Sequence, residues 1–261
     1  MKFASLGSGS KGNATLIAAG DTLLLVDCGF SARETLRRCE RLGVHPEQID
    51  AVLVTHEHSD HCSGVATLSR RYQLPVYLTH GTASSGRCED PHQSHRFNAG
   101  DRFQIGDIEV TSVAVPHDAR EPCQYRFSAA GQSLGVLTDL GSVTPHVIES
   151  FSRCGGLLLE FNHDLDMLWE GSYPPGLKKR VAGDWGHLNN EQAAQLLAQL
   201  AWSGLSQVVV AHISENNNCR DKAEACIAAV YGPMETLTWA DQAEGFGWLE
   251  LKHRESLPLA H

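Results

Sequence analysis

Short apolar runs that end at a histidine or an aspartate are the feature of this sequence that most restricts its fold. Residues 49–54 form a continuous apolar run that leads into Thr55-His56-Glu57-His58-Ser59-Asp60-His61. Three further apolar runs end at His117, Asp139 and His212. Runs of this length are typical of buried strands. Strands that each bring one such residue to the same edge of a sheet build a rigid metal site. The sequence therefore predicts a sheet whose strand ends share a polar site.

The order of the remaining elements predicts an α/β chain with two sheets. The first block begins with strands at 2–6, 14–19 and 22–26, and the spacing of Ser31 to Glu34 fits a capping box at the start of a helix. Further strands are expected at 75–79, 108–115, 124–129, 133–138, 156–161, 207–211 and 236–239, and helices at 61–72, 145–153, 190–202 and 220–230. Two such blocks need two packed sheets covered by helices. We predict an αββα sandwich, with two mixed β-sheets flanked by helices.

Length and composition indicate one domain inside the cell. Residues 1–261 are expected to form a single domain, because no linker of Pro, Gly and Ser divides the chain. No stretch has the roughly 20 apolar residues of a membrane span, and the first residues are unlike a signal peptide. We therefore expect a cytoplasmic protein that binds no membrane. The 8 cysteines contain no Cys-x-x-Cys motif, which favours reduced thiols.

The net charge of −10 argues against a broad basic surface for nucleic acid. Short basic groups such as Lys178-Lys179-Arg180 still allow a local one, although each is more typical of a solvated helix or loop face.

The segment from His56 to His61 carries four metal-binding side chains. His56 and His58 are two residues apart in an extended segment, which places both rings on one side, while Asp60 and His61 begin the next helix. The alternative is an exposed turn that is rich in histidine by chance. Imidazoles and carboxylates without thiolates suit zinc or manganese. Two such ions about 3.5 to 4 Å apart share a bridging hydroxide that attacks as a nucleophile near neutral pH. The segment thus predicts a metal site, and its residue types permit the chemistry of a dinuclear hydrolase.

Loop residues close to these strand ends are candidates for catalysis. Asp60 is expected both to bind metal and to accept a proton, whereas Glu57 is expected to point away. His163 and His187 stand in loops after apolar segments, where a side chain would contact the substrate or donate a proton. The alternative for both is an ordinary exposed loop histidine.

Two loops of small polar residues are candidates for binding a substrate phosphate. The loop 7–13 satisfies Gly-x-Gly-x-x-Gly, but a strand follows it instead of a helix, so it predicts no dinucleotide site. Its backbone N–H groups could still approach a phosphate, although a plain turn is the more common outcome. The loop after His212 offers a similar choice between phosphate binding and helix capping. The candidate residues are Ser8, Ser10, Asn13, Ser214 and Asn217.

Taken in order, these residues resemble the signature of the metallo-β-lactamase superfamily, which is an early Asp, His-x-His-x-Asp-His, a His, an Asp and a final His. The match covers most of the chain. Four segments, at 7–13, 160–164, 186–191 and 212–217, are similar to the YycJ-like (WalJ) branch of that superfamily, although Asn189 stands where a serine is expected. The branch implies a DNA exonuclease that acts from 5' ends in the 5'-3' direction.

The resemblance also implies a role for each residue of the signature. One metal would be held by His56, His58 and His117, the second by Asp60, His61 and His212, and Asp139 would bridge them while Asp27 orients the ligands from behind.

The metal site by itself does not choose the substrate. Two metals stabilise charge on a phosphoryl or an acyl oxygen alike. The leading hypothesis is a phosphodiesterase that degrades DNA ends with two zinc or manganese ions. The alternative is a small-molecule hydrolase, either a thioesterase of the glyoxalase II type or a cyclic phosphodiesterase, which the acidic charge does not hinder. A redox or binding protein that keeps the metals without hydrolysis is disfavoured by the intact Asp60. The oligomeric state is not predicted.

Overall fold

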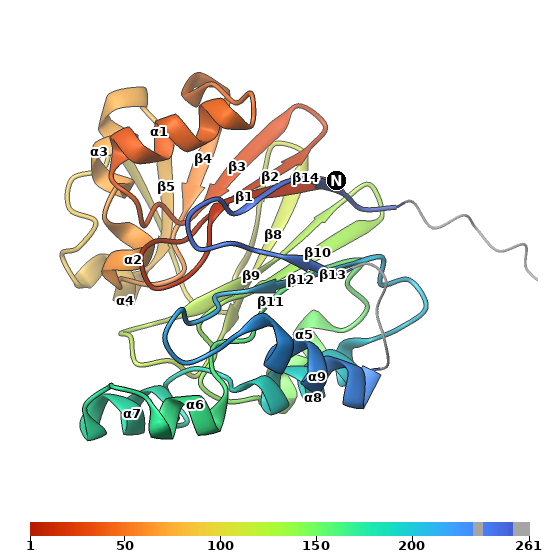
Figure 1. Cartoon of the computed structure of the whole chain (residues 1–261). Helices are drawn as coiled ribbons and strands as arrows, with labels where there is room; N and C mark the ends of the chain where they lie inside the picture. Colours follow the sequence, from red (N-terminus) through yellow and green to blue (C-terminus); the bar gives the residue numbers. More distant parts are fainter. Residues whose placement is uncertain (232–236, 253–261) are drawn as a thin grey trace, which may run out of the picture.

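The computed structural model describes residues 1–231 and 237–252. In this part of the chain, two β-sheets pack face to face and helices cover both outer sides (Figure 1). In spatial order the first sheet contains β14 (Phe246–Glu250), β1 (Lys2–Gly7), β2 (Ala14–Ala19), β3 (Thr22–Val26), β4 (Ala51–Leu53), β5 (Pro75–Thr79) and β6 (Gln93–Phe97). The second contains β13 (Leu237–Trp239), β12 (Gln207–Ala211), β11 (Gly156–Glu160), β10 (Gln132–Leu137), β9 (Cys123–Ala129), β8 (Ile108–Ala114) and β7 (Arg102–Ile105).

Both sheets combine antiparallel and parallel strands. In the first, β1, β2 and β3 pair antiparallel and β3 to β6 pair parallel. In the second, β7 to β10 pair antiparallel and β10 to β13 pair parallel. The parallel strands bring their carboxyl ends to one edge of each sheet, which is where open α/β sheets place their ligand sites.

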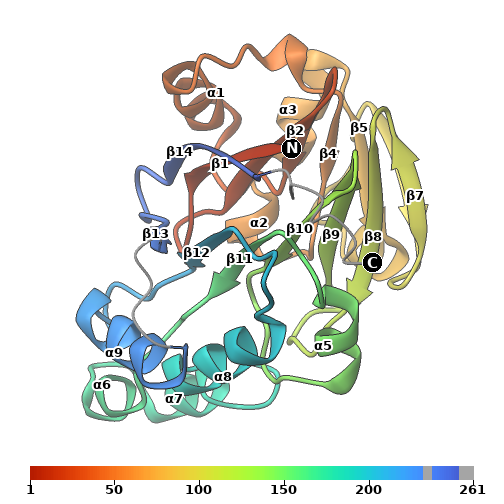
Figure 2. The ribbon, with the colours of Figure 1, turned by 90° about the vertical axis from the view of Figure 1, so that its right-hand side faces the viewer.

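Helices cover the outer face of each sheet, as Figures 1 and 2 show. α1 (Ala32–Arg41) and α3 (Val65–Tyr72) lie over the first sheet, and α5 (Pro145–Phe151), α8 (Asn190–Leu200) and α9 (Arg220–Tyr231) lie over the second. One apolar core fills the space between the sheets, and two more lie beneath the helices. The predicted αββα sandwich of mixed sheets is therefore confirmed. No helix in the described residues is long and apolar enough to cross a membrane.

Most predicted elements are present, but the helix predicted at 61–72 is wrong as a single element. It is two helices, α2 (Ser59–Cys62) and α3, separated at Gly64. A Cβ on Gly64 would lie 2.2 Å from the Phe30 carbonyl oxygen, so the chain bends where it packs against another loop. The capping box at Ser31 is only half formed. Ser31 Oγ accepts a hydrogen bond from the Glu34 N–H, but the Glu34 carboxylate pairs with Arg37 and Arg38 instead.

Several short elements were not predicted. They are the 3-10 turn at Pro46–Gln48, α4 (His80–Ser84), β6, β7, α6 (Leu165–Glu170), α7 (Pro175–Val181) and β14. Their sequences lack a clear alternation or helical period, so contacts with the rest of the fold decide their conformation. The predicted strand at 49–54 is shortened to β4, and residue 236 of the predicted strand at 236–239 lies outside the described residues.

The ends of five strands carry the polar residues singled out in the sequence. β3 is followed by Asp27, β4 by the loop to His61, β8 by the loop to His117, β10 by Asp139 and β12 by His212. Asp27, Asp139 and His212 have φ angles of 61°, 71° and 51°. Left-handed backbone is uncommon for residues with a Cβ, although Asp and His adopt it more readily than most. The bends aim these three side chains across the sheet edge.

Candidate metal centre

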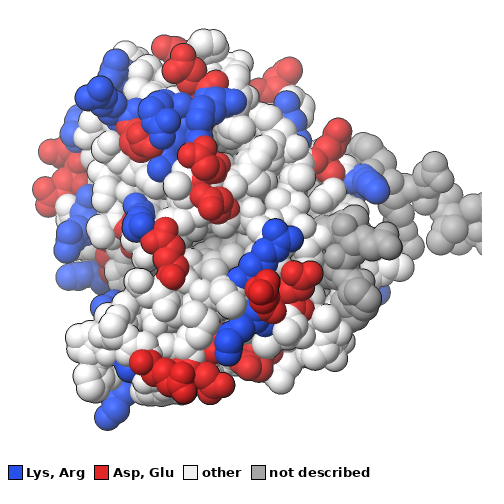
Figure 3. Space-filling view, viewed as in Figure 1, with Lys and Arg blue, Asp and Glu red and all other residues white. Residues whose placement is uncertain are grey.

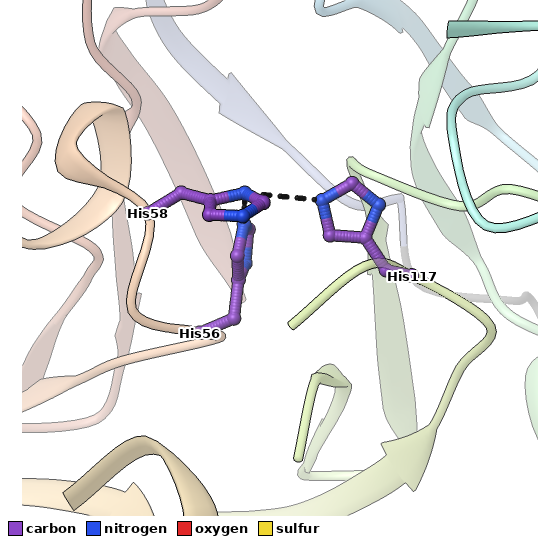
Figure 4. Close-up of side chains that lie close together, drawn as sticks. All are labelled: His56, His58 and His117. Atoms are coloured by element: carbon purple, nitrogen blue, oxygen red, sulfur yellow. Dashed lines mark hydrogen bonds between the residues drawn. The ribbon is translucent and has the colours of Figure 1, made fainter. Parts of the chain in front are cut away.

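Three histidine rings converge on one point in the first half of the site. His56 and His58 come from the loop after β4, and His117 comes from the loop after β8 (Figure 4). His56 Nε2 lies 3.0 Å from His58 Nδ1, and His117 Nε2 lies 3.3 Å from the same atom. These ligand atoms all lie within 4.8 Å of one another, which is close enough for one metal ion to contact all three.

Burial keeps two imidazoles of the first cluster, His56 and His117, neutral. Burial lowers the pKa of His56 well below its usual value and lowers that of His117. His117 Nδ1 lies 3.0 Å from the Gly186 carbonyl oxygen, to which it donates, so its Nε2 keeps a free lone pair. His56 Nδ1 lies 2.9 Å from Thr55 Oγ1, a contact that likewise leaves His56 Nε2 with a free lone pair. Neutral, oriented imidazoles are the form that binds metal.

A second cluster lies beside the first and contains two carboxylates. It is made of Asp60, His61, Asp139 and His212, whose ligand atoms also lie within 4.8 Å of one another. His61 Nε2 is 3.1 Å from Asp139 Oδ2, and His212 Nδ1 is 3.3 Å from Asp139 Oδ1. Asp139 Oδ1 also lies 4.0 Å from His117 Nε2. Asp139 therefore stands between the two clusters.

The buried carboxylates beside the second cluster favour a positive charge there. Burial raises the pKa of Asp139, but His212 and His61 outweigh it and hold the pKa well below the usual range. Burial likewise opposes the charge on His212, yet Asp139 and Glu160 raise its pKa to about 10. Asp139 Oδ2 and His212 Nδ1 are buried, and their close contacts with His61 Nε2 and Asp139 Oδ1 lack hydrogen-bond geometry. A divalent cation would satisfy both atoms and replace the protons, so the residues present fit a metal ion.

Residues behind the clusters hold the ligands in place. Asp27 Oδ2 lies 2.8 Å from His61 Nδ1, and Thr55 Oγ1 donates to the same carboxylate oxygen at 2.9 Å. Ser8 Oγ accepts a hydrogen bond of 3.0 Å from the His212 N–H. Asn13 Nδ2 lies 3.0 Å from His61 Nε2 and donates to the Gly9 carbonyl. Ser8 and Asn13, expected to bind phosphate, thus contact His212 and His61 of the second cluster.

Glu160 is a member of the site that the sequence reasoning missed. Its side chain is fully buried at the end of β11, and its oxygens accept hydrogen bonds from the backbone N–H groups of Asp139, Leu140 and Leu188. Glu160 Oε2 lies 3.1 Å from His187 Nδ1 and 3.4 Å from His212 Nδ1. Its position after the apolar residues Leu157-Leu158-Leu159 is the signal that identified Asp139, and it could have identified Glu160 too.

The two clusters open into a cavity of about 450 Å³. Its walls include Ser10, Asp60, Arg87, His187, Ser214 and Asn217. The structure thus brings His187, Ser10, Ser214 and Asn217 to the same pocket as the clusters. Asn217 is buried, and its Oδ1 has no hydrogen-bond partner.

Two other residues discussed from the sequence lie away from the clusters. His163 is buried, its ring nitrogens have no partner, burial lowers its pKa to about 4, and it does not line the cavity. The structure does not bring it to the site. Glu57 lines the cavity but turns from the ligands, and its Oε1 accepts a hydrogen bond of 2.8 Å from the Arg120 N–H.

The sandwich and the His and Asp clusters at its edge define a metal-dependent hydrolase of the metallo-β-lactamase fold. A family model described as a β-lactamase superfamily domain matches residues 22–213. The exodeoxyribonuclease WalJ of Streptococcus pneumoniae is 35% identical over 229 residues, which cover 85% of each protein. The exodeoxyribonuclease YycJ of Bacillus anthracis is 35% identical over 235 residues, covering 88% of this chain and 89% of the relative. The chain belongs to the β-lactamase superfamily and, within it, to the family of WalJ and YycJ.

A solved structure agrees with this assignment at the level of the fold. The metallo-β-lactamase fold protein YhfI from Bacillus subtilis superposes with a TM-score of 0.74 and is 18% identical, covering 95% of this chain and 98% of that chain. The resemblance seen in the sequence is therefore confirmed.

Proposed function

We propose that this protein is a DNA exonuclease that removes nucleotides from 5' ends with two bound zinc or manganese ions. The observation that carries the proposal is that two ligand clusters meet at Asp139 and open into one pocket, in a chain related to WalJ and YycJ, which are named exodeoxyribonucleases. Residues 1–261 would act as one domain, in the cytoplasm.

The ligand roles follow the two clusters. His56, His58 and His117 would hold the first ion and Asp60, His61 and His212 the second, with Asp139 between them. Two bound divalent ions supply a Lewis acid for the phosphoryl oxygens and a water that ionises near neutral pH. Zinc and manganese both accept this set of imidazoles and carboxylates.

Two side chains of the pocket are suited to moving protons. Asp60 is only partly buried and lines the cavity, so its carboxylate can accept a proton from the attacking water. His187 also lines the cavity, and Glu160 Oε2, 3.1 Å from its Nδ1, orients the ring. We assign to His187 the donation of a proton to the leaving oxygen. His163 has no assigned role, since it lies outside the pocket.

Polar and basic residues of the pocket are suited to a phosphodiester. Ser10, Ser214 and Asn217 provide uncharged donors, and Arg87 and Arg180 also line the cavity. Ser8 and Asn13 would act indirectly, by positioning His212 and His61. On the face shown in Figure 3, basic and acidic side chains are interspersed. DNA binding would therefore depend on these local groups near the pocket and not on a broad basic surface.

A small-molecule hydrolase is the second candidate. A cavity of about 450 Å³ is within the size range of sites for small ligands, and a net charge of −10 does not oppose a small ester. A thioesterase of the glyoxalase II type or a cyclic phosphodiesterase would use the same metals.

The two candidates are separated by substrate comparison. Metal-stripped protein is reloaded with manganese or zinc and incubated with end-labelled single- and double-stranded DNA, an acylated glutathione thioester and a cyclic dinucleotide. Stepwise release of mononucleotides from the 5' end, lost with chelator and in Asp60→Ala, is the expected result. Intact DNA with turnover of either small substrate would contradict the nuclease assignment.

A further inference from the structure

An ion pair lies in the wall of the cavity, outside both ligand clusters. Arg180 of α7 donates from its Nε to Asp118 Oδ2, and both side chains line the cavity. Asp118 directly follows the cluster residue His117 in the loop after β8. The ion pair therefore joins two segments that are 62 residues apart in the sequence, at the edge of the metal centre.

The Asp118 carboxylate lies between this guanidinium and the first cluster. Its Oδ2 accepts the hydrogen bond from Arg180, whereas its Oδ1 is 3.5 Å from His117 Nε2 and 3.7 Å from His58 Nε2. The rings of His58 and His117 face each other in Figure 4. A single carboxylate group thus separates the Arg180 guanidinium from two imidazoles of the first cluster.

The helix that carries Arg180 is tied to a loop of the metal centre. The His187 N–H donates to the Val181 carbonyl of α7 at 2.9 Å. In the same loop, the Gly186 carbonyl oxygen accepts a hydrogen bond of 3.0 Å from His117 Nδ1. A Cβ on Gly186 would lie 2.2 Å from the Arg180 carbonyl oxygen, so the end of α7 packs directly on this loop. Backbone contacts as well as the ion pair therefore fix Arg180 relative to the first cluster.

Arg180 keeps N–H groups that can bind a ligand. Asp118 occupies its Nε, and its Nη1 and Nη2 have no partner among the described residues. The Arg180 side chain is 59% exposed, whereas that of Asp118 is 28% exposed. A planar guanidinium donates two parallel hydrogen bonds to the oxygens of a phosphate. The ion pair therefore presents an oriented phosphate-binding group at the cavity.

The charges of the cavity leave this group available for an anion. The residues that line the cavity carry four carboxylates and two guanidinium groups: Glu57, Asp60, Asp118, Asp139, Arg87 and Arg180. Two bound divalent ions carry four positive charges, which equal the charges of the four carboxylates. The two guanidinium groups then give the lining a positive charge. Of the two, Arg180 is the one that an ion pair holds beside a ligand cluster.

We propose that Arg180 contacts a non-bridging oxygen of the phosphodiester that is cut, and that Asp118 is the positioning residue that holds its guanidinium there. The inference rests on the proposed nuclease function and adds a catalytic residue to it. A fixed guanidinium stabilises the negative charge that develops on the phosphoryl oxygens in the transition state. Loss of a hydrogen bond to a charged group of this kind lowers kcat/KM by roughly tenfold to a hundredfold.

The first measurement is kcat/KM on end-labelled DNA for the manganese-loaded wild type, Arg180→Ala, Asp118→Asn and the double variant. Arg180→Ala should lower kcat/KM roughly tenfold to a hundredfold, and guanidinium chloride added at millimolar concentration should restore part of it. Asp118→Asn should cause a smaller loss. The double variant should be no slower than Arg180→Ala, because Asp118 acts through Arg180.

Lys179→Ala is the matched control for the charge of α7. Lys179 is an exposed cation on the same helix and does not line the cavity, so this variant should keep the wild-type kcat/KM. Metal content should be the same in all variants. Circular dichroism shows whether the variants are folded.

The second measurement separates this inference from the proposed function. Titration calorimetry on the same manganese-loaded proteins gives Kd for thymidine 5'-monophosphate, which offers a phosphate but no internucleotide bond to cut. Arg180→Ala should raise this Kd roughly tenfold or more, and Lys179→Ala should not change it. If the wild type binds the nucleotide through Arg180 but leaves DNA intact, the nuclease function fails and the phosphate contact stands.

Three results would overturn the inference. The first is unchanged kcat/KM and Kd in Arg180→Ala, and the second is an equal loss in Lys179→Ala, which would assign the effect to the net charge of α7. The third is a lower metal content in Asp118→Asn, which would make Asp118 a metal ligand and not the positioning residue of Arg180.

Discussion

Asp27 Oδ2 lies 2.8 Å from His61 Nδ1, and both side chains are buried. The contact directs His61 Nε2 toward Asp139 Oδ2, at 3.1 Å. A carboxylate behind a metal-binding imidazole fixes the ring and makes it a stronger ligand. In the proposed metal centre, the second ion would therefore depend on Asp27, which is not one of its proposed ligands.

Replacing Asp27 should weaken one metal site more than the other. Asp27→Asn keeps the shape of the side chain but removes its charge, and the affinity of the second ion should fall about 10- to 100-fold. Isothermal titration of metal-free protein with manganese measures both sites. Asp221→Asn, an exposed carboxylate on α9, is the control. Equal affinities in Asp27→Asn and wild type would contradict this role.

Asp60 should be needed for turnover. Asp60→Ala removes both a proposed ligand and the proposed proton acceptor, and general acid–base catalysis alone contributes about 10²- to 10⁴-fold. A loss of kcat of at least about 10²-fold on end-labelled DNA is expected, measured under single-turnover conditions with excess metal. If Asp60→Ala keeps more than about a tenth of the wild-type rate, Asp60 is not needed for catalysis.

Glu160 should support folding as well as the site. Three backbone N–H groups donate to its buried carboxylate, and Glu160→Ala leaves all three without a partner. The free energy of unfolding should fall by about 3 to 5 kcal/mol. Urea denaturation in the presence of chelator measures the loss without any contribution from metal. Glu160→Gln keeps an acceptor oxygen, so its free energy of unfolding should fall less than that of Glu160→Ala. An equal fall in the two variants would mean that the negative charge, and not the hydrogen bonds, stabilises the fold.

Metal affinity should rise with pH. Burial disfavours charge on His212, but Asp139 and Glu160 raise its pKa to about 10, so the metal-free protein holds a proton there at neutral pH. A metal ion must displace that proton, and competition from protons is strongest at low pH. Each released proton gives up to about a tenfold gain in affinity per pH unit below this pKa. Titration calorimetry in buffers of different ionisation enthalpy should detect the release of protons when metal binds. If no proton is released, metal binding is not coupled to deprotonation of His212.

Gly29 should tolerate no side chain. A Cβ there would lie 1.7 Å from the Asp60 carbonyl oxygen, which accepts a hydrogen bond of 2.7 Å from the Asn13 N–H. Gly29→Ala must therefore push the metal-binding loop away, with loss of metal affinity and a fall in stability of about 1 to 3 kcal/mol. Gly247→Ala, which meets no atom within 4 Å, is the control. Metal content and the unfolding midpoint should both be lower in Gly29→Ala than in Gly247→Ala.

The parts of the site that the sequence predicts are those encoded locally. His56, His58, Asp60 and His61 follow one apolar run, and Asp139 stands two residues after the end of another, so strand-end position and residue type suffice. The break at Gly64 could not be predicted, because it arises from packing against Phe30, distant in sequence. α6 and α7 have too few buried residues to show a period, and their place beside the pocket depends on long-range contacts such as Arg180 to Asp118.

The central claim is that the two ligand clusters each hold a divalent ion. Anomalous diffraction from crystals of manganese-loaded protein tests it directly. We predict two peaks, one among His56, His58 and His117 and one among Asp60, His61 and His212, with an Asp139 oxygen near both. A single peak, or peaks away from these side chains, would contradict the account.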